Sequence, residues 1–201
     1  MNTLKLFAVI VAVAVSSVAV SQKIKVKGDL DPIKQYDKVQ VVFDYSEMSV
    51  GKYKEEKNYV DYKVAELNED EPGKGDKWIQ GWRDNREAKY EPKFEELINE
   101  YVEKVGLSAY KSLEDAPVKM VIKTYHTEPG FNVGVMRKDA HIHVKVHFVE
   151  KGSDNEFATM DIKNVPGRGG MGYDFDAAFR IQEAYAKLGK EVGKYLVKKV
   201  Y

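Results

Sequence analysis

Alternating apolar residues between Ala140 and Phe148 constrain the fold of this chain more than any other feature. Every second position of the segment is apolar: Ala140, Ile142, Val144, Val146 and Phe148. Side chains two residues apart along a strand point to the same face of a sheet, so the pattern predicts a strand with one face in the core. Residues 118–125 and 158–162 predict two further strands. The turn-forming residues 151–155 indicate that the last two strands are antiparallel neighbours.

Two apolar stripes at helical spacing accompany these strands. The first stripe comprises Phe94, Leu97, Ile98, Tyr101, Val102 and Val105. The second lies within residues 175–196, and Asp174 is expected to cap that helix. A helix with one apolar stripe buries it against another layer. With a Val-rich strand over 39–45, we therefore expect an α+β fold: a mixed, mainly antiparallel sheet of about four strands, with two long amphipathic helices on one face.

Residues 52–90 are rich in charged and aromatic residues. Val60, Val64 and Leu67 recur at helical spacing and predict a helix over residues 53–67, although the alternation around Tyr62 leaves a strand open. Asp76 is expected to cap a second helix. We interpret about 52–90 as a charged, aromatic helical insertion in a single domain.

The first 21 residues form a separate unit. Lys5 precedes an apolar run from Leu6 to Val15, and small residues follow up to Ser21, an order typical of an export signal. We expect a signal peptide over 1–21 and a single α+β domain over 22–201. A retained anchor is the alternative, but a spanning helix needs about 20 apolar residues. The sequence thus predicts an exported protein, periplasmic or extracellular, with no transmembrane span after cleavage.

Composition excludes several classes of function. The chain has 32 basic and 32 acidic residues, so it has no bulk positive charge for nucleic acid, whose binding depends on neutralising phosphates. It has no Cys, which excludes disulfides, thiolate nucleophiles, Cys-based zinc sites and a lipid attached to a Cys behind the signal. No strong catalytic or nucleotide motif is present, so we predict no catalytic residue and no cofactor, and a non-enzymatic protein is favoured.

Three histidines lie on the face of the 140–148 strand that is opposite its apolar residues: His141, His143 and His147. His141 and His143 are about 7 Å apart along a strand that rises roughly 3.3 Å per residue, and such a pair can bind one metal ion. Lys145 on the same face would repel a cation, and residues 140–148 contain no acidic residue. A solvated face is therefore favoured. The alternative is an exported metal-binding protein or hydrolase that uses this face, with His141 and His143 as the candidate metal ligands.

Two other segments contain candidate binding residues. The Gly-rich residues 167–172 precede a helix, but Pro166 and the acidic residues that follow favour a flexible connector over a phosphate site. Trp78, Trp82 and Tyr90 form a candidate interaction surface, because aromatic residues are enriched at interfaces. Packing of this segment onto the free face of the sheet is the other explanation.

Six segments give the chain a recognisable layout: residues 39–45, 94–106, 118–125, 140–148, 158–162 and 167–196. This layout resembles that of small bacterial envelope proteins related to the amino-terminal domain of TolB and to CsgG-like and DUF4410-type lipoproteins. The chain departs from them in lacking the lipid-bearing Cys and in its insertion over 52–90. The resemblance implies a non-enzymatic protein-interaction or assembly module whose partner is another envelope protein. It implies no site residue.

Overall fold

The computed structural model describes residues 24–133, 136–153, 155–168 and 176–201. The predicted signal peptide, the expected cap Asp174 and most of the Gly-rich segment lie outside the described residues. The strands are β1 (Ile24–Gly28), β2 (Lys38–Asp44), β3 (Ser49–Val50), β4 (Ser108–Tyr110), β5 (Val118–Glu128), β6 (Phe131–Val133), β7 (Met136–Lys138), β8 (Ala140–Glu150) and β9 (Glu156–Gly167). The helices are η1 (Asp31–Gln35), α1 (Glu56–Asp70), α2 (Lys74–Asn85), η2 (Arg86–Tyr90), α3 (Glu91–Val102), η3 (Glu103–Val105) and α4 (Ala177–Lys199).

Seven strands form one mixed sheet in the order β1-β9-β8-β5-β2-β4, with β3 paired to β5 beyond the end of β2. The pairs among β1, β9, β8 and β5 are antiparallel, whereas β2 is parallel to both β5 and β4. The predicted α+β class and mainly antiparallel sheet are confirmed. The sheet has seven strands instead of about four because β1, β3 and β4 contain only five, two and three residues, too few for alternation to reveal all of them.

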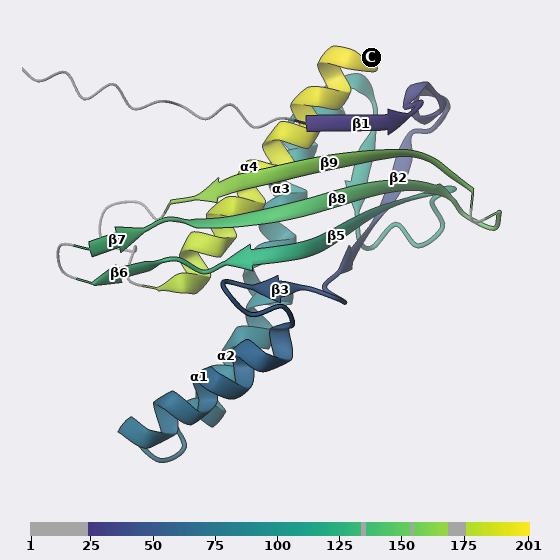
Figure 1. The fold of residues 1–201 in the computed structure, drawn as a ribbon. Helices are drawn as coiled ribbons and strands as arrows, with labels where there is room; N and C mark the ends of the chain where they lie inside the picture. Colours follow the sequence, from purple (N-terminus) through teal and green to yellow (C-terminus); the bar gives the residue numbers. More distant parts are fainter. Residues whose placement is uncertain (1–23, 134–135, 154, 169–175) are drawn as a thin grey trace, which may run out of the picture.

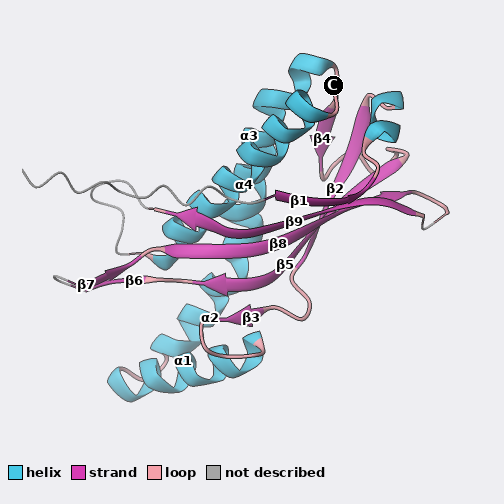
Figure 2. Ribbon diagram, turned by 45° about the horizontal axis from the view of Figure 1, so that its top comes forward, coloured by secondary structure: helices cyan, strands magenta, loops and turns pink. Residues whose placement is uncertain are grey.

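One face of this sheet forms the core. The five apolar residues predicted to share a face of β8 are all 0 % exposed. Helices α3 and α4 lie side by side on this face (Figures 1 and 2). They approach closely because Gly189 and Gly193 have no side chain. A Cβ at these positions would lie 2.4 Å from the Phe94 carbonyl oxygen and 2.9 Å from that of Ile98.

Several local expectations require correction. The helix expected over residues 53–67 is present as α1, from Glu56 to Asp70, so the competing strand is wrong. Asp76 does not cap α2, since that helix begins at Lys74 and its N-cap position is occupied by Gly73 with a φ of 83°. The cap of α4 is Asp176, whose side chain accepts from the Ala178 N–H at 2.8 Å. Gly167, expected to begin a flexible connector, belongs to β9, because the strand continues to pair with β8 up to this residue.

The helices α1 and α2 pack against each other and project away from the sheet (Figure 1). From α2 the chain passes through the π-helix η2 directly into α3, with helical backbone angles at both junctions. No described helix is both long enough and apolar enough to cross a membrane.

Candidate metal centre

A β-bulge brings a third histidine to the face that carries His141 and His143. Along β5, Thr124 pairs with Val144 but His126 pairs with His143, so Tyr125 is an extra residue. A bulge shifts the alternation of a strand by one residue. Residues 118, 120, 122 and 124 are buried, whereas after the bulge His126 is half-buried and Thr127 is buried. His126 therefore lies beside the β8 histidines instead of pointing into the core.

The rings of His126, His141 and His143 form a compact cluster. Their ring centroids are 4.8 Å apart for His126 and His143, 5.4 Å for His141 and His143, and 5.7 Å for His126 and His141. One ring nitrogen from each residue belongs to a set whose members all lie within 4.8 Å of one another. All three residues are half-buried. The cluster thus presents three imidazoles to one point on an accessible face.

Two polar side chains from other elements hydrogen-bond to the cluster. Ser49 in β3 places its Oγ 2.9 Å from His126 Nδ1, and the same hydroxyl donates to the Tyr125 carbonyl oxygen at 3.1 Å. In β9, the amide oxygen of Asn164 lies 3.0 Å from His143 Nε2. Asn164 has a φ of 54° and lies where the β8–β9 register shifts between Ile142 and Val144.

The electrostatic environment keeps two of these rings neutral near pH 7. Burial lowers the pKa of His126, and the neighbouring His143 and His141 lower it further. The pKa of His141 is lowered by burial and by His143. A metal ion requires unprotonated imidazole nitrogens, so few protons have to be displaced from these two residues at neutral pH.

An acidic side chain lies next to the cluster, although residues 140–148 of β8 contain none. Glu128 of β5 pairs in register with His141. Its carboxylate accepts from the Gly130 N–H at 3.1 Å and from Lys138 Nζ at 2.6 Å. Lys138 and burial act in opposite directions on the Glu128 carboxyl, whose pKa is lowered overall. The Glu128 carboxylate is therefore ionised beside the imidazoles, and the Lys138 ammonium is paired with it.

Lys145 and His147 do not belong to the cluster. The Lys145 ammonium lies 5.9 Å from the centre of the Tyr125 ring, and that ring meets His143 edge-on at 5.7 Å. His147 is further along β8, where its Nδ1 lies 2.5 Å from Glu156. The structure therefore assembles His126, His141 and His143, and it pairs His147 with a carboxylate of β9.

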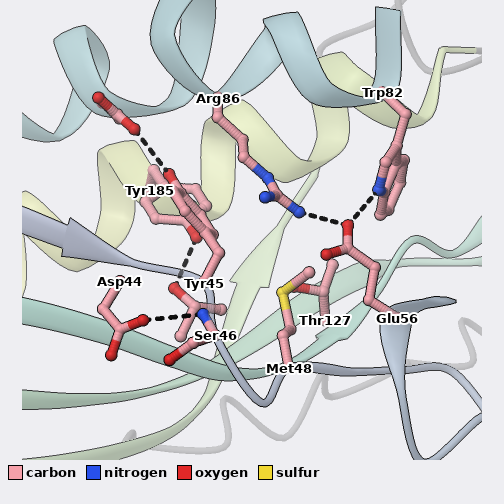
Figure 3. Close-up of polar contacts among 11 residues, drawn as sticks. Asp44, Tyr45, Ser46, Met48, Glu56, Trp82, Arg86, Thr127 and Tyr185 are labelled. Carbon is pink, nitrogen blue, oxygen red and sulfur yellow. Dashed lines mark hydrogen bonds and ion pairs between the residues drawn. The ribbon is translucent and has the colours of Figure 1, made fainter. Parts of the chain in front are cut away.

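The aromatic residues of the charged insertion are largely buried. Trp82 is 8 % exposed and Tyr90 is 5 % exposed, while Trp78 is half-buried. Trp82 stacks on Trp78 at 5.5 Å and its indole N–H donates to Glu56 at 2.5 Å (Figure 3). Tyr90 stacks on Tyr185 of α4 at 5.4 Å. These residues pack between helices, not onto the free face of the sheet. Their role as an interaction surface stays a prediction that depends on Trp78.

Sequence reasoning identified two of the three clustered histidines. It missed His126, because strict alternation from Val118 assigns residue 126 to the core face. It also missed Ser49 and Asn164, whose partners come from strands far away in the sequence. The sequence does contain one indication of an irregular backbone at position 164, because Asn tolerates positive φ better than most residues. Chemically, the assembled group can bind a transition-metal ion, since imidazole is a ligand for Zn, Cu and Ni.

Comparisons with known proteins assign no family. No family model matches the chain, and no curated protein matches it. Two structures of a PelC dodecamer from Paraburkholderia phytofirmans are similar. The first has a TM-score of 0.38 and 8 % identity over 86 % of this chain and 97 % of that chain. The second has a TM-score of 0.32 and 11 % identity over 84 % and 99 %.

A DUF330 protein from Xanthomonas campestris is also similar, with a TM-score of 0.33 and 10 % identity over 52 % of this chain and 58 % of that chain. At these TM-scores none of the three likenesses bears on the function of this chain. The resemblance in layout to TolB-related, CsgG-like and DUF4410-type proteins thus stays a resemblance, and the functional argument depends on the chain's own residues.

Proposed function

We propose that this protein is an exported metal-binding protein that holds one divalent transition-metal ion, Zn²⁺ or Cu²⁺, through His126, His141 and His143. One observation carries the proposal: a ring nitrogen of each histidine lies in a set no more than 4.8 Å across. Neutral imidazole nitrogens are ligands for Zn²⁺ and Cu²⁺, so three of them at this separation can share one ion.

The distances are compatible with coordination after small side-chain rotations. In a tetrahedral zinc site with Zn–N bonds of about 2.0–2.1 Å, two ligand nitrogens are about 3.3 Å apart. The three nitrogens thus have to approach one another by at most about 1.5 Å, which half-buried rings can do by rotation. Three protein ligands leave a fourth tetrahedral position open. A water molecule can fill that position.

The predicted export signal determines where this site would encounter its ion. Residues 1–21 have the charge and hydropathy order of a signal peptide, which supports a periplasmic or extracellular location. In this setting a metal site without Cys ligands is not exposed to thiol oxidation. The chain contains no Cys, so its imidazoles supply the nitrogen ligands that zinc and copper favour.

Metal binding and a role as an interaction module are compatible, because the three histidines belong to β5 and β8, whereas helices α1 and α2 project away from the sheet (Figure 1). The sequence-based hypothesis of a non-enzymatic envelope module therefore stays a second proposal. Its test is separate: the Trp78→Ala variant should lose the envelope protein that the wild type retains after cross-linking, while its metal content stays unchanged.

Stoichiometry in the purified mature protein tests the metal proposal. We expect about one Zn²⁺ or Cu²⁺ per chain after dialysis against metal-free buffer, measured by elemental mass spectrometry and by calorimetric titration. His126→Ala and His143→Ala should each abolish stoichiometric binding. His147→Ala is the matched control, because His147 is on the same strand but outside the cluster, and it should bind like the wild type. Equal metal contents in all four proteins would reject the proposal.

A further inference from the structure

We propose that Ser49 and Asn164 are positioning residues that hold His126 and His143 with their unprotonated nitrogens available to the metal ion. The inference rests on the proposed metal-binding function and adds two residues from β3 and β9 to the site. It assigns opposite nitrogens to the two rings, so that His126 binds through Nε2 and His143 binds through Nδ1.

The Ser49 hydroxyl determines the proton position on His126. A serine hydroxyl has a single hydrogen, and Ser49 donates it to the Tyr125 carbonyl oxygen at 3.1 Å. At His126 Nδ1, 2.9 Å away, the same oxygen can therefore act only as an acceptor. Nδ1 of the neutral ring carries the proton, and Nε2 carries the lone pair. The carbonyl of the bulged residue thereby fixes the tautomer of the histidine that follows it.

Asn164 acts in the same way on the other side of the cluster. Its amide oxygen lies 3.0 Å from His143 Nε2, and a carbonyl oxygen can only accept. Nε2 of His143 therefore carries the proton, which leaves Nδ1 as the ligand atom. The backbone of Asn164 has a φ of 54°, a conformation that costs energy for most residues. The residue with the unfavourable backbone conformation is therefore the one that contacts a histidine of the cluster.

Such contacts recur around metal-binding histidines for a physical reason. A histidine that binds through one nitrogen usually donates its other N–H to an oxygen, which fixes the ring orientation and increases ligand basicity. Loss of such a partner typically costs about 10–100-fold in metal affinity. Two of the three clustered rings already have such a partner in the structure, on different strands and at different ring atoms.

The first experiment determines the tautomers of His126 and His143 in the metal-free protein. Long-range ¹H–¹⁵N NMR spectra of the metal-free protein at pH 8 should show His126 protonated at Nδ1 and His143 protonated at Nε2. In Ser49→Ala, His126 should change to the Nε2–H form that an unpartnered histidine favours. In Ser49→Thr, which keeps the hydroxyl, it should keep the Nδ1–H form. His126 in the Nε2–H form in the wild type would overturn the assignment.

The second experiment measures Zn²⁺ affinity by competition with a chromophoric chelator. Ser49→Ala and Asn164→Gly should each weaken binding by about 10–100-fold. Glycine is chosen because it tolerates the positive φ. Ser49→Thr and Asn164→Asp, which keep an acceptor oxygen, should stay within a few-fold of the wild type. If Ser49→Ala and Asn164→Gly bind as tightly as the wild type, this inference fails.

The two proposals fail in different ways. If His126→Ala retains stoichiometric Zn²⁺, the metal-binding proposal itself is wrong. If the histidine variants lose the metal but Ser49→Ala and Asn164→Gly do not weaken binding, the metal site stands and the positioning role is rejected. Circular dichroism of each variant identifies any loss of fold, and Ser46→Ala, at an exposed serine outside the site, is the control for a general effect of substitution.

Discussion

Two polar clusters in this molecule differ in how their donor and acceptor groups are matched by hydrogen bonds. Around Glu56, the carboxylate accepts from the Trp82 indole N–H and from Arg86, so donors meet an acceptor (Figure 3). In the histidine cluster, three groups of the same kind meet one another. A cluster in which donors and acceptors match is explained by folding alone. Ser49 and Asn164 each satisfy one ring nitrogen of a histidine in this cluster, but these bonds do not explain why three like groups lie together.

This difference indicates where the sequence serves stability and where it serves binding. Protonation of the three adjacent rings would place like charges side by side, which is unfavourable. Groups with perturbed pKa values in such arrangements concentrate at functional sites. The Glu56 cluster instead joins α1 to the end of α2 and to η2, and holds the insertion together. We therefore assign binding to the first cluster and architecture to the second.

The largest expected effect is stabilisation by metal. A ligand that binds only the folded state at 100 times its Kd stabilises it by about 2.7 kcal/mol. For a chain of this size, each kcal/mol shifts Tm by about 2–4 °C. Zn²⁺ at that concentration should therefore raise the wild-type Tm by about 5–11 °C in differential scanning calorimetry.

The comparison of the two clusters predicts which variants keep this shift. His126→Ala should show a Zn²⁺-induced shift close to zero, whereas Glu56→Ala should keep the wild-type shift even though it starts from a lower Tm. A full shift in His126→Ala, or its loss in Glu56→Ala, would reverse the roles assigned to the two regions.

A smaller effect is expected from breaking the Glu56 cluster. Glu56→Ala leaves the largely buried Trp82 N–H and the Arg86 guanidinium without their acceptor. An unsatisfied buried group costs about 1–3 kcal/mol, and we expect a loss in this range in urea denaturation. As a control, Glu69→Ala on an exposed part of α1 should change the free energy of unfolding by less than about 0.5 kcal/mol. Equal effects of both variants would show that this cluster does not stabilise the insertion.

The core face of the sheet was predictable from the sequence, and the opposite face was not. Ala140, Ile142 and Val144 alternate with polar residues, and this simple period is sufficient to place them in the core. The helix stripe around Ile98 was equally readable, although Leu97, expected on the same stripe, is only half-buried. These features depend on residues close in sequence, for which a period of two or of 3.6 contains the information.

The histidine face depends instead on how different strands are paired. The bulge at Tyr125 moves His126 from the core face of the sheet to the opposite face, and no residue type nearby in the sequence indicates this bulge. Ser49 lies 77 residues before His126 in the chain, and Asn164 lies 21 residues after His143. Register between distant strands is decided by the whole sheet. Two ligands were therefore visible in the His-x-His pattern, and the third ligand and its neighbours were not.

The smallest predicted effect is on the pH dependence of stability in the metal-free protein. The pKa values of His126 and His141 in the folded state lie below the ordinary value of 6.5. Below pH 6.5 the unfolded chain therefore binds protons at these residues more readily than the folded chain does. The stability linked to the neutral rings is fully present above pH 6.5 and is lost as the pH falls through the lowered pKa values of the folded state.

Substitution of one ring by a neutral side chain tests this sign. With chelator present, the urea midpoint of the wild type should decrease between pH 7 and pH 5. In His126→Gln this decrease should be smaller, because one of the two rings with a lowered pKa is gone. His147→Gln should not reduce the decrease in the same way, since His147 lies outside the cluster, where its Nδ1 is 2.5 Å from Glu156. If His126→Gln made the acid loss steeper, the rings would be stabilised as cations, and the picture of a neutral cluster prepared for a metal ion would be wrong.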